Sequence, residues 1–198
     1  MVSIMKAGDE FGTLYVVATP IGNLDDLTQR AIQTFSKVDL IIAEDTRHTR
    51  KLLSFLGIEK PLQAYHDHNE TEKTDKIIEL LQQKKDIALV SDAGTPLISD
   101  PGYILVKKCR ELGLKVTPIP GVSALVTALS VSGLPTDSFR FNGFPPRQVS
   151  RRREFFQGFL KETATLVFYE SSHRIKDCLE DAVAAFGEDR QACLAWDL

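Results

Sequence analysis

The chain has 198 residues, of which 43% are hydrophobic and 26% charged, which is typical of a globular protein with one large or two small α/β units. The formal net charge of −3 excludes a global positive field, so any contact with nucleic acid must come from a local basic patch. Because no apolar run approaches the roughly 18 residues of a membrane span and the N-terminal segment lacks a secretory apolar stretch, the composition predicts a soluble, cytoplasmic protein.

Short β-branched runs alternate with helix-length amphipathic segments, a pattern typical of a mostly parallel sheet flanked by helices. Strands are predicted over 13–19, 40–43, 87–91 and 115–118, with a weaker one over 63–65. Helices are predicted between them, over 27–36, 46–56, 71–84, 103–112 and 122–131. The fold class is therefore α/β.

After Gly133-Leu134-Pro135 the sequence changes to aromatic strands and a basic helix, followed by a helix over 174–186 and a final strand from Gln191. This change predicts two domains: 1–137, an N-terminal α/β domain with a mostly parallel sheet, and 138–198, a C-terminal α/β domain. Cys109, Cys178 and Cys193 fall in a predicted helix, helix and strand without the CxxC spacing of a metal or redox site. We expect reduced core thiols.

Ligands of open α/β sheets bind outside the carboxyl ends of the strands, and four unusual loops follow predicted strands here. The first is "TPIGN" at 19–23, which also serves as a plain structural turn. The second is "EDTRHTR" at 44–50, where Asp45 or Thr46 can cap a helix and a salt-bridged helix start is the alternative. Neither loop alone distinguishes a site from a turn.

The third loop, "SDAGTPLISDPG" at 91–102, contains two turns where a minimal connection needs one. It lacks both GxxxxGK[ST] and GxGxxG, and its carboxylates suit hydroxyl, amine or sulfonium groups better than phosphate. The fourth, "PGVSAL" at 120–125, opens a helix of small residues, for which close helix packing explains the pattern equally well. The third loop is thus the strongest candidate for a binding site.

Several ordered motifs carry a family resemblance: "GTLYVVATPIGNLDDLTQRA", "DLIIAEDTRHTRKLL", "HDHNE", "ALVSDAGTPLISDPG", "PIPGVSAL", "GFPP" and "FYESSHRI". From about Gly12 to Ala195 the chain resembles the tetrapyrrole methylase superfamily, and within it the small-subunit ribosomal RNA methyltransferases of type I. The resemblance implies a tetrapyrrole-methylase-like fold of two α/β domains with an S-adenosyl-L-methionine cleft between them. It also implies methylation of a cytidine ribose 2′-hydroxyl in small-subunit (16S) ribosomal RNA.

Carried over motif by motif, the resemblance assigns residues of both domains to S-adenosyl-L-methionine. Those of the first domain are Pro20, Gly22, Asp92, Ala93, Gly94, Thr95, Ser99, Asp100 and Ser123. Those of the second domain, which would close the cleft, are Phe144, Pro145, Tyr169 and Glu170.

A neutral ribose hydroxyl is a poor nucleophile, so a nearby base or a group that stabilises the developing oxyanion would help. The catalytic candidates are Glu44, Asp45, His66 and Asp100, without a preference among them. His66 and His68 would share a face of a strand, but without further ligands we favour polar surface contacts or substrate positioning and expect no metal.

The densest basic run comprises Arg147, Arg151, Arg152 and Arg153, beside Phe155 and Phe156. Together with a second patch of Arg47, Arg50 and Lys51, it is a candidate surface for RNA phosphates. The alternative is a solvated helix face.

Two other functions stay open: a small-molecule, tetrapyrrole-type methyltransferase, for which the basic run would be idle, and an inactive ribosome-binding fragment. Relatives continue beyond "CLAWDL", so the resemblance implies a C-terminally truncated chain with an incomplete second domain. It further implies the assembled 30S subunit as substrate and a homodimer.

Overall fold

The computed structural model describes residues 10–197. Residues 1–9, which belong to the N-terminal segment that lacks the apolar stretch of a secretory signal, lie outside this range. The chain divides into two compact units, one ending at Ser123 and the other beginning at Ala124. Helix α5 (Ala124–Val131) thus belongs to the second unit, where the backbone N–H of Leu125 donates to the Tyr169 hydroxyl across 3.1 Å. From the sequence this boundary was predicted to lie later, after residue 137.

The first unit is built on a five-stranded parallel sheet with strand order β3-β2-β4-β1-β5. The strands are β1 (Thr13–Val17), β2 (Leu40–Ala43), β3 (Leu62–Ala64), β4 (Ile87–Val90) and β5 (Lys115–Ile119). Every strand predicted for this part of the chain is present, the weaker one as β3. Because all strands run in one direction, the loops that follow them emerge at the same edge of the sheet.

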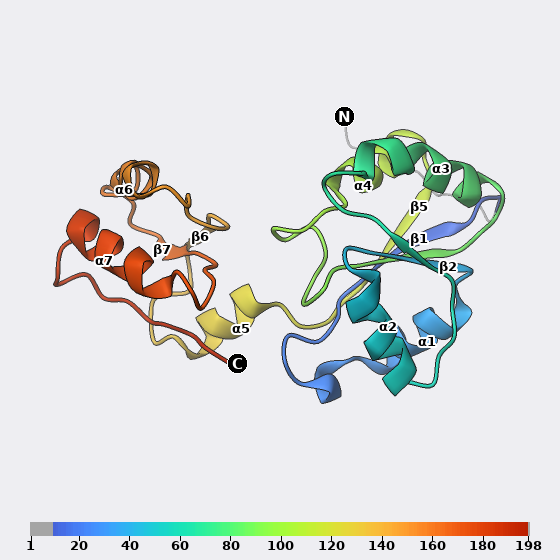
Figure 1. Ribbon diagram of the computed structural model, residues 1–198, viewed down its shortest axis with the longest axis horizontal. Coiled ribbons are helices and arrows are strands. Elements are labelled where there is room, and N and C mark those ends of the chain that lie inside the picture. The colour runs from blue at the N-terminus through green and yellow to red at the C-terminus, as the bar shows by residue number, and fades with distance from the viewer. Residues whose placement is uncertain (1–9, 198) are drawn as a thin grey trace. The chain divides into compact units, whose positions relative to one another are not determined.

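Helices cover both faces of this sheet. They are α1 (Gln29–Lys37), α2 (Thr46–Phe55), α3 (Glu70–Gln82) and α4 (Tyr103–Glu111), with a short 3-10 helix, η1 (Leu24–Asp26), before α1. Helices α1 and α2 lie on one face, and α3 and α4 on the other (Figure 1). The central strand β4 is buried throughout: Leu89 belongs to the core under α3 and α4, and Ala88 and Val90 to the core under α1 and α2. Burial on both faces explains its unbroken apolar sequence.

Side-chain caps fix where the first two helices start. The Thr28 hydroxyl accepts from the N–H of Ala31 at 3.1 Å, and the Asp45 carboxylate accepts from the N–H of Arg47 at 2.8 Å. Asp45 is the N-cap of α2, so one role proposed for it from the sequence is confirmed. Helix α2 therefore begins directly after the carboxylates that leave β2.

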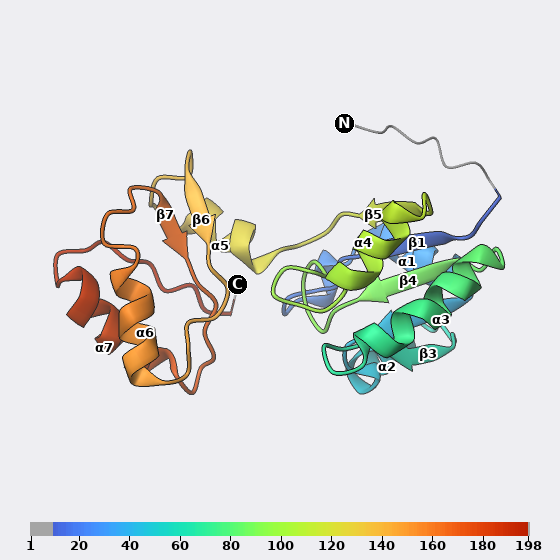
Figure 2. The ribbon, with the colours of Figure 1, turned by 90° about the horizontal axis from the view of Figure 1, so that it is seen from above.

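The second unit pairs two short parallel strands, β6 (Phe139–Phe141) and β7 (Thr165–Val167). Helices α6 (Val149–Gln157) and α7 (Ile175–Phe186) lie beside each other in this unit (Figure 2). Ring contacts with centroid distances of 5.1 to 6.0 Å join α6 to the chain after β7 and to α7, through Phe155, Phe156, Phe159, Phe168 and Phe186. This aromatic cluster forms the core of the unit.

The strand predicted from Gln191 is wrong. Residues 191–197 have no regular structure and pair with no strand among the described residues. Cys109 and Cys178 are buried as expected, but Cys193 is exposed. A strand needs a partner edge, which local sequence does not specify. Among residues 10–197, no helix is long and apolar enough to cross a membrane.

Candidate functional site

Backbone and hydroxyl hydrogen bonds join three loops at the carboxyl edge of the sheet. Thr19, after β1, and Gly94, after β4, exchange both backbone hydrogen bonds at 2.9 and 3.0 Å. The Thr19 hydroxyl also donates to the carbonyl of Ser91 at 3.2 Å. The Thr95 hydroxyl donates to the carbonyl of Val122, after β5, at 3.1 Å. The loops predicted as binding elements therefore form one connected surface within the first unit.

The loop after β4 is also conformationally strained. Leu97 and Ser99 have φ values of 73° and 68°, a region that non-glycine residues rarely occupy. Gly102 ends the loop at φ 126°, where an added Cβ would lie 2.7 Å from Leu89 Cδ2. Strained residues of this kind gather at ligand sites, where the surrounding structure holds them in place. The strain supports a binding role for the loop.

Carboxylates from three neighbouring strand ends converge here. Burial, followed by the charges of Asp100, Asp92, Asp67 and Asp45, raises the pKa of Glu44 from its ordinary value of 4.5 to about 7. Burial likewise raises the pKa of Asp100, with Asp92 and Asp67 adding to the effect. The strand order β3-β2-β4 brings these carboxylates together. Asp67 follows β3, Glu44 follows β2, and Asp92 and Asp100 follow β4. The site favours cationic or hydrogen-donating ligands.

Asp45 differs from its neighbours because its carboxylate is already engaged. It accepts side-chain and backbone hydrogen bonds from Arg47, the shortest at 2.7 Å, and these hold its pKa well below the ordinary range. Its own N–H donates to Asp92 Oδ1 at 3.1 Å. A carboxylate with such a low pKa is a weak base, so among the four catalytic candidates Asp45 is suited to structure rather than proton transfer.

His66 and His68 lie in the turn after β3, not on a strand, which corrects the geometry assumed from the sequence. His66 Nε2 is 2.9 Å from the Asn69 side-chain nitrogen, and its Nδ1 is buried without a hydrogen-bond partner. Within residues 10–197, no group of three or more His, Cys, Asp or Glu is placed to hold a metal ion. His66 borders the carboxylates through Asp67, the next residue.

The remaining first-unit residues assigned to the cofactor lie in the same loops. Their side chains or backbones are half-buried or exposed at the sheet edge: Pro20, Gly22, Ala93, Ser99 and Ser123. Ala18 and Gly121 approach so closely that a Cβ on Gly121 would lie 2.8 Å from that of Ala18. The small residues of the fourth loop therefore serve close loop packing.

In the second unit, the assigned residues contact one another. The Tyr169 ring packs against Phe141 and Phe144, with centroids 4.8 and 5.7 Å away. The Glu170 carboxylate is only 4% exposed, and its Oε1 lies 2.5 Å from Arg174 Nη2. Pro145 is buried, whereas Phe144 is 51% exposed. Of these residues, Phe144 offers the most free surface to a ligand.

The basic run is divided between buried and exposed positions. The Arg152 side chain is 3% exposed and pairs with the equally buried Asp181 at 2.5 Å, so its assignment to RNA is wrong. Arg153 also pairs with Asp181, at 2.6 Å. Arg147 and Arg151 are exposed. In the other patch Arg47 pairs with Asp45, while Arg50 and Lys51 are exposed on α2.

Three residues that the structure places at or near these sites were not predicted from the sequence. Asp67 adds its charge to the carboxylate group, and its position after a weakly predicted strand was the available signal. Glu70 accepts from the backbone N–H of Gly102 at 3.3 Å and so holds the end of the strained loop. Arg174 was visible only as the arginine of "FYESSHRI".

The chain is similar to known proteins in sequence and in fold. Residues 13–198 match the family model described as Tetrapyrrole (Corrin/Porphyrin) Methylases. The chain is 55% identical over 190 residues to the ribosomal RNA small subunit methyltransferase I of Haemophilus influenzae, covering 96% of this chain and 67% of that protein. It is 54% identical over 193 residues to its namesake from Escherichia coli O157:H7, covering 98% and 68%.

The chain thus spans about two thirds of the length of these relatives. A crystal structure of uroporphyrin-III-C-methyltransferase from Thermus thermophilus has the same fold, with a TM-score of 0.53, 22% identity, and coverage of 69% of this chain and 64% of that one. The chain belongs to the tetrapyrrole methylase family and, within it, to the ribosomal RNA small subunit methyltransferase I proteins.

Proposed function

We propose that this chain transfers a methyl group from S-adenosyl-L-methionine to small-subunit ribosomal RNA, and that the acceptor is the 2′-hydroxyl of a cytidine ribose. The observation that carries the proposal is the proximity of Glu44, which follows β2, to Asp92 and Asp100 of the strained loop after β4, at the carboxyl edge of a parallel sheet. Family membership supports methyl transfer, and the names of the relatives support ribosomal RNA as the substrate.

The residues of the first unit fit the methyl donor. Burial and, after it, repulsion from the neighbouring carboxylates raise the pKa of Glu44, and a positive charge placed among these carboxylates would relieve the repulsion. S-adenosyl-L-methionine carries two such charges, the sulfonium and the amino group, and its bound sulfonium supplies the reactive methyl. Asp92 and Asp100 would bind these cations, while the loops of Pro20, Gly94 and Ser123 would provide backbone contacts.

Glu44 is the group best suited to accept a proton from the acceptor hydroxyl. With a pKa of about 7, it can release and accept a proton near neutral pH, which an ordinary carboxyl group cannot do efficiently. Asp100, whose pKa is also raised, is the second candidate for this base. His66 is the third candidate, because it borders the carboxylates through Asp67, the next residue. The hydroxyl proton would pass to the Glu44 carboxylate as the O–CH₃ bond forms, while the S–CH₃ bond of the donor breaks and the demethylated thioether leaves.

Exposed basic side chains would position the RNA backbone. Arg50 and Lys51 lie on α2, which starts directly after Glu44 and Asp45, so phosphates bound there would lie near the carboxylates. Arg147 and Arg151 of the second unit would add further contacts. Methylation within the assembled 30S subunit, a homodimer, a cofactor cleft between the two domains and a cytoplasmic location stay predictions.

The test is calorimetric titration with S-adenosyl-L-methionine and its demethylated product, followed by methyl transfer to unmodified 30S subunits. A 2′-O-methyl group blocks alkaline cleavage, so digestion would locate the modified ribose and identify its base. Glu44→Gln should bind cofactor but lose at least about 100-fold in transfer rate, while Glu79→Gln, an exposed substitution on α3, should change neither. A folded chain that binds no cofactor would contradict the proposal; transfer only to a tetrapyrrole would replace the substrate.

A further inference from the structure

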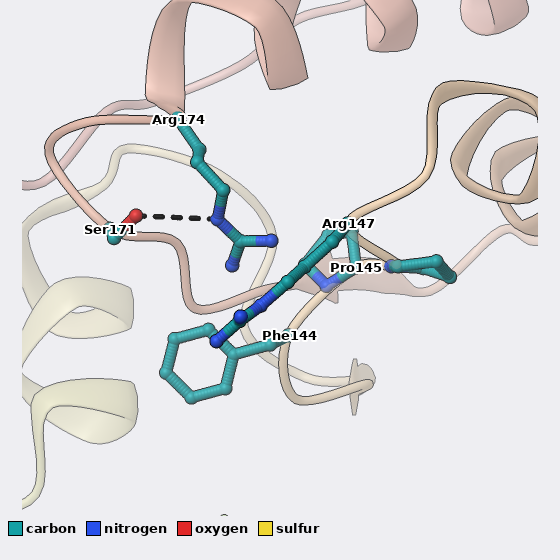
Figure 3. Close-up of a pocket in the computed structure, with 6 residues that line it drawn as sticks. Phe144, Pro145, Arg147, Ser171 and Arg174 are labelled. Atoms are coloured by element: carbon teal, nitrogen blue, oxygen red, sulfur yellow. Dashed lines mark hydrogen bonds between the residues drawn. The ribbon is translucent and has the colours of Figure 1, made fainter.

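The second unit contains a cavity of about 490 Å³ lined by Phe144, Pro145, Pro146, Arg147, Ser171 and Arg174. Phe144 to Arg147 follow β6, whereas Ser171 and Arg174 follow β7 and precede α7. Because β6 and β7 are parallel neighbours, both loops leave the same edge of the small sheet. Figure 3 shows the two guanidinium groups and the Phe144 ring facing a common space.

Arg174 is held in place by the protein but is incompletely satisfied by it. Its Nη2 pairs with Glu170 at 2.5 Å and its Nε donates to the Ser171 hydroxyl at 3.3 Å (Figure 3). Its Nη1 is buried and has no hydrogen-bond partner, although the side chain as a whole is 26% exposed. This guanidinium is therefore incompletely paired within the protein, and the exposed part of the Arg174 side chain lines the cavity, where an oxygen-rich ligand would bind to its positive charge.

Charge in the cavity favours an anion. Glu170 neutralises Arg174, and its carboxylate also accepts from the N–H of Ser171 at 2.7 Å, so it is committed inside the protein. The exposed side chain of Arg147 then leaves the lining with a net positive charge. Arginine forks bind phosphate oxygens in a paired geometry, which suits a phosphodiester better than a single spherical anion.

Phe144 adds a surface that phosphate alone would not require. Its ring is 51% exposed and makes an edge contact with the Tyr169 ring, at a centroid distance of 5.7 Å. The Tyr169 hydroxyl accepts a hydrogen bond from the N–H of Leu125, which holds Tyr169 in place. An exposed aromatic ring next to arginines is the arrangement on which proteins stack unpaired bases of single-stranded nucleic acid. The cavity thus offers both parts of a nucleotide site.

We infer that this cavity binds one unpaired nucleotide of the RNA substrate, with its phosphate on Arg147 and Arg174 and its base on Phe144. The inference rests on the proposed RNA substrate and adds a subsite to it. It also gives Phe144 a different ligand from the cofactor contact implied by family resemblance, and the two assignments can be separated by experiment.

The experiment measures binding of a fluorescein-labelled, single-stranded 12-nucleotide RNA with the 30S target sequence, across a range of salt concentrations. Phe144→Leu, which keeps the apolar contact with Tyr169, should weaken binding about tenfold. Arg147→Ala should reduce the salt slope by about 0.7, the value for one lost phosphate contact on a single strand. The matched controls are Phe55→Leu, an exposed ring on α2, and Arg110→Ala, an exposed arginine on α4 outside the cavity.

Cross-linking with ultraviolet light gives a readout independent of substitution. Cross-links in the bound RNA complex should map to the peptide that contains Phe144. Tight RNA binding in which Phe144→Leu and Arg147→Ala behave like their controls would overturn the nucleotide site and leave the RNA substrate intact. Loss of cofactor binding without loss of RNA binding in Phe144→Leu would also overturn it, and absence of RNA binding by the native chain would remove both proposals.

Discussion

Oδ1 of Asp92 accepts a hydrogen bond from the backbone N–H of Asp45 across 3.1 Å, which joins the loop after β4 to the start of α2. Asp92 contributes both a hydrogen-bond acceptor and a negative charge. Substitution by asparagine separates the two, because it keeps the acceptor oxygen and removes the charge. We expect Asp92→Ala to lower the free energy of unfolding by about 1 kcal/mol and Asp92→Asn to leave it nearly unchanged. Both should weaken S-adenosyl-L-methionine binding at least about tenfold, because both remove the charge.

Calorimetric titration and urea unfolding measure the two effects. Native affinity in Asp92→Asn would show that the charge of Asp92 does not contribute to cofactor binding, and would remove it from the proposed site.

The raised pKa of Glu44 predicts a specific dependence of stability on pH. The folded chain holds the Glu44 proton up to about pH 7, whereas the unfolded chain releases it near 4.5. The stabilisation from this proton is complete below pH 4.5 and is lost as the pH rises toward 7 and above. Because Glu44→Gln mimics the protonated form, we expect the variant to be more stable than the native chain at pH 8 and nearly equal to it at pH 4.5. Urea unfolding at both pH values tests this expectation.

The same two measurements on Glu79→Gln provide the control, since that exposed substitution should show no pH-dependent difference. If the stability of Glu44→Gln followed that of the native chain at every pH, burial and the surrounding carboxylates would not raise the pKa of Glu44 as the structure indicates.

Arg152 and Asp181 form a buried ion pair that ties α6 to α7, with side chains 3% and 4% exposed. Removing Arg152 leaves the buried Asp181 carboxylate with Arg153 as its remaining cationic partner. We expect Arg152→Ala to lower the free energy of unfolding by about 3 kcal/mol, the lower end of the cost of breaking a buried ion pair, because Arg153 still compensates part of the charge. Arg151→Ala, an exposed change on the same helix, should cost less than about 0.5 kcal/mol. Similar losses in thermal unfolding for the two variants would contradict the assignment of Arg152 to the core.

The difference between these arginines shows what local sequence does not predict, namely which residue of a basic run is buried. A basic run looks uniform, but on a helix Arg152 shares a face with Phe156, four residues later, and Phe156 is buried. The sequence contained this periodicity. It did not indicate that Arg152 pairs with the buried Asp181 on α7, because the two residues are 29 positions apart. Pairing with a residue distant in sequence therefore determines which arginine of the run is buried.

The same limit applies to the candidate site. Apolar runs predicted the strands of the first sheet well, because parallel strands buried on both faces leave a clear pattern. They also located the loops where Glu44 and Asp92 lie. The sequence did not predict that Asp67 joins them, because strand order β3-β2-β4 is not the order of the chain. The absent strand at 191–197 has the same cause, since pairing is a tertiary property.

The cysteines provide a direct check of burial. Burial raises the pKa of the Cys109 thiol to about 12 and that of Cys178 to about 11, so both should be unreactive in the folded chain. Cys193 is exposed. We expect a colorimetric disulfide reagent to modify one thiol rapidly in the native protein and all three in denaturant. The fast reaction should disappear in Cys193→Ser; fast modification of two thiols would contradict the packing of α4 or α7.

Gly102 tests whether the shape of the strained loop supports the cofactor site. Alanine at this position would be forced to φ 126° and would place its Cβ 2.7 Å from Leu89 in the sheet core. Gly57 is the matched control, because its φ is 66° and a Cβ there would meet nothing within 4 Å. We expect Gly57→Ala to lower the free energy of unfolding by about 1 kcal/mol, and Gly102→Ala to lower it by more because a steric clash is added.

Gly102→Ala should also weaken S-adenosyl-L-methionine binding, because moving residue 102 disturbs the hydrogen bond from its N–H to Glu70 and the turn that carries Asp100. Binding is measured by calorimetry at a temperature where both variants remain folded. A Gly102→Ala variant that is destabilised but binds cofactor with native affinity would separate the shape of this loop from the binding site. In that case the carboxylates, rather than the strained backbone, would account for recognition.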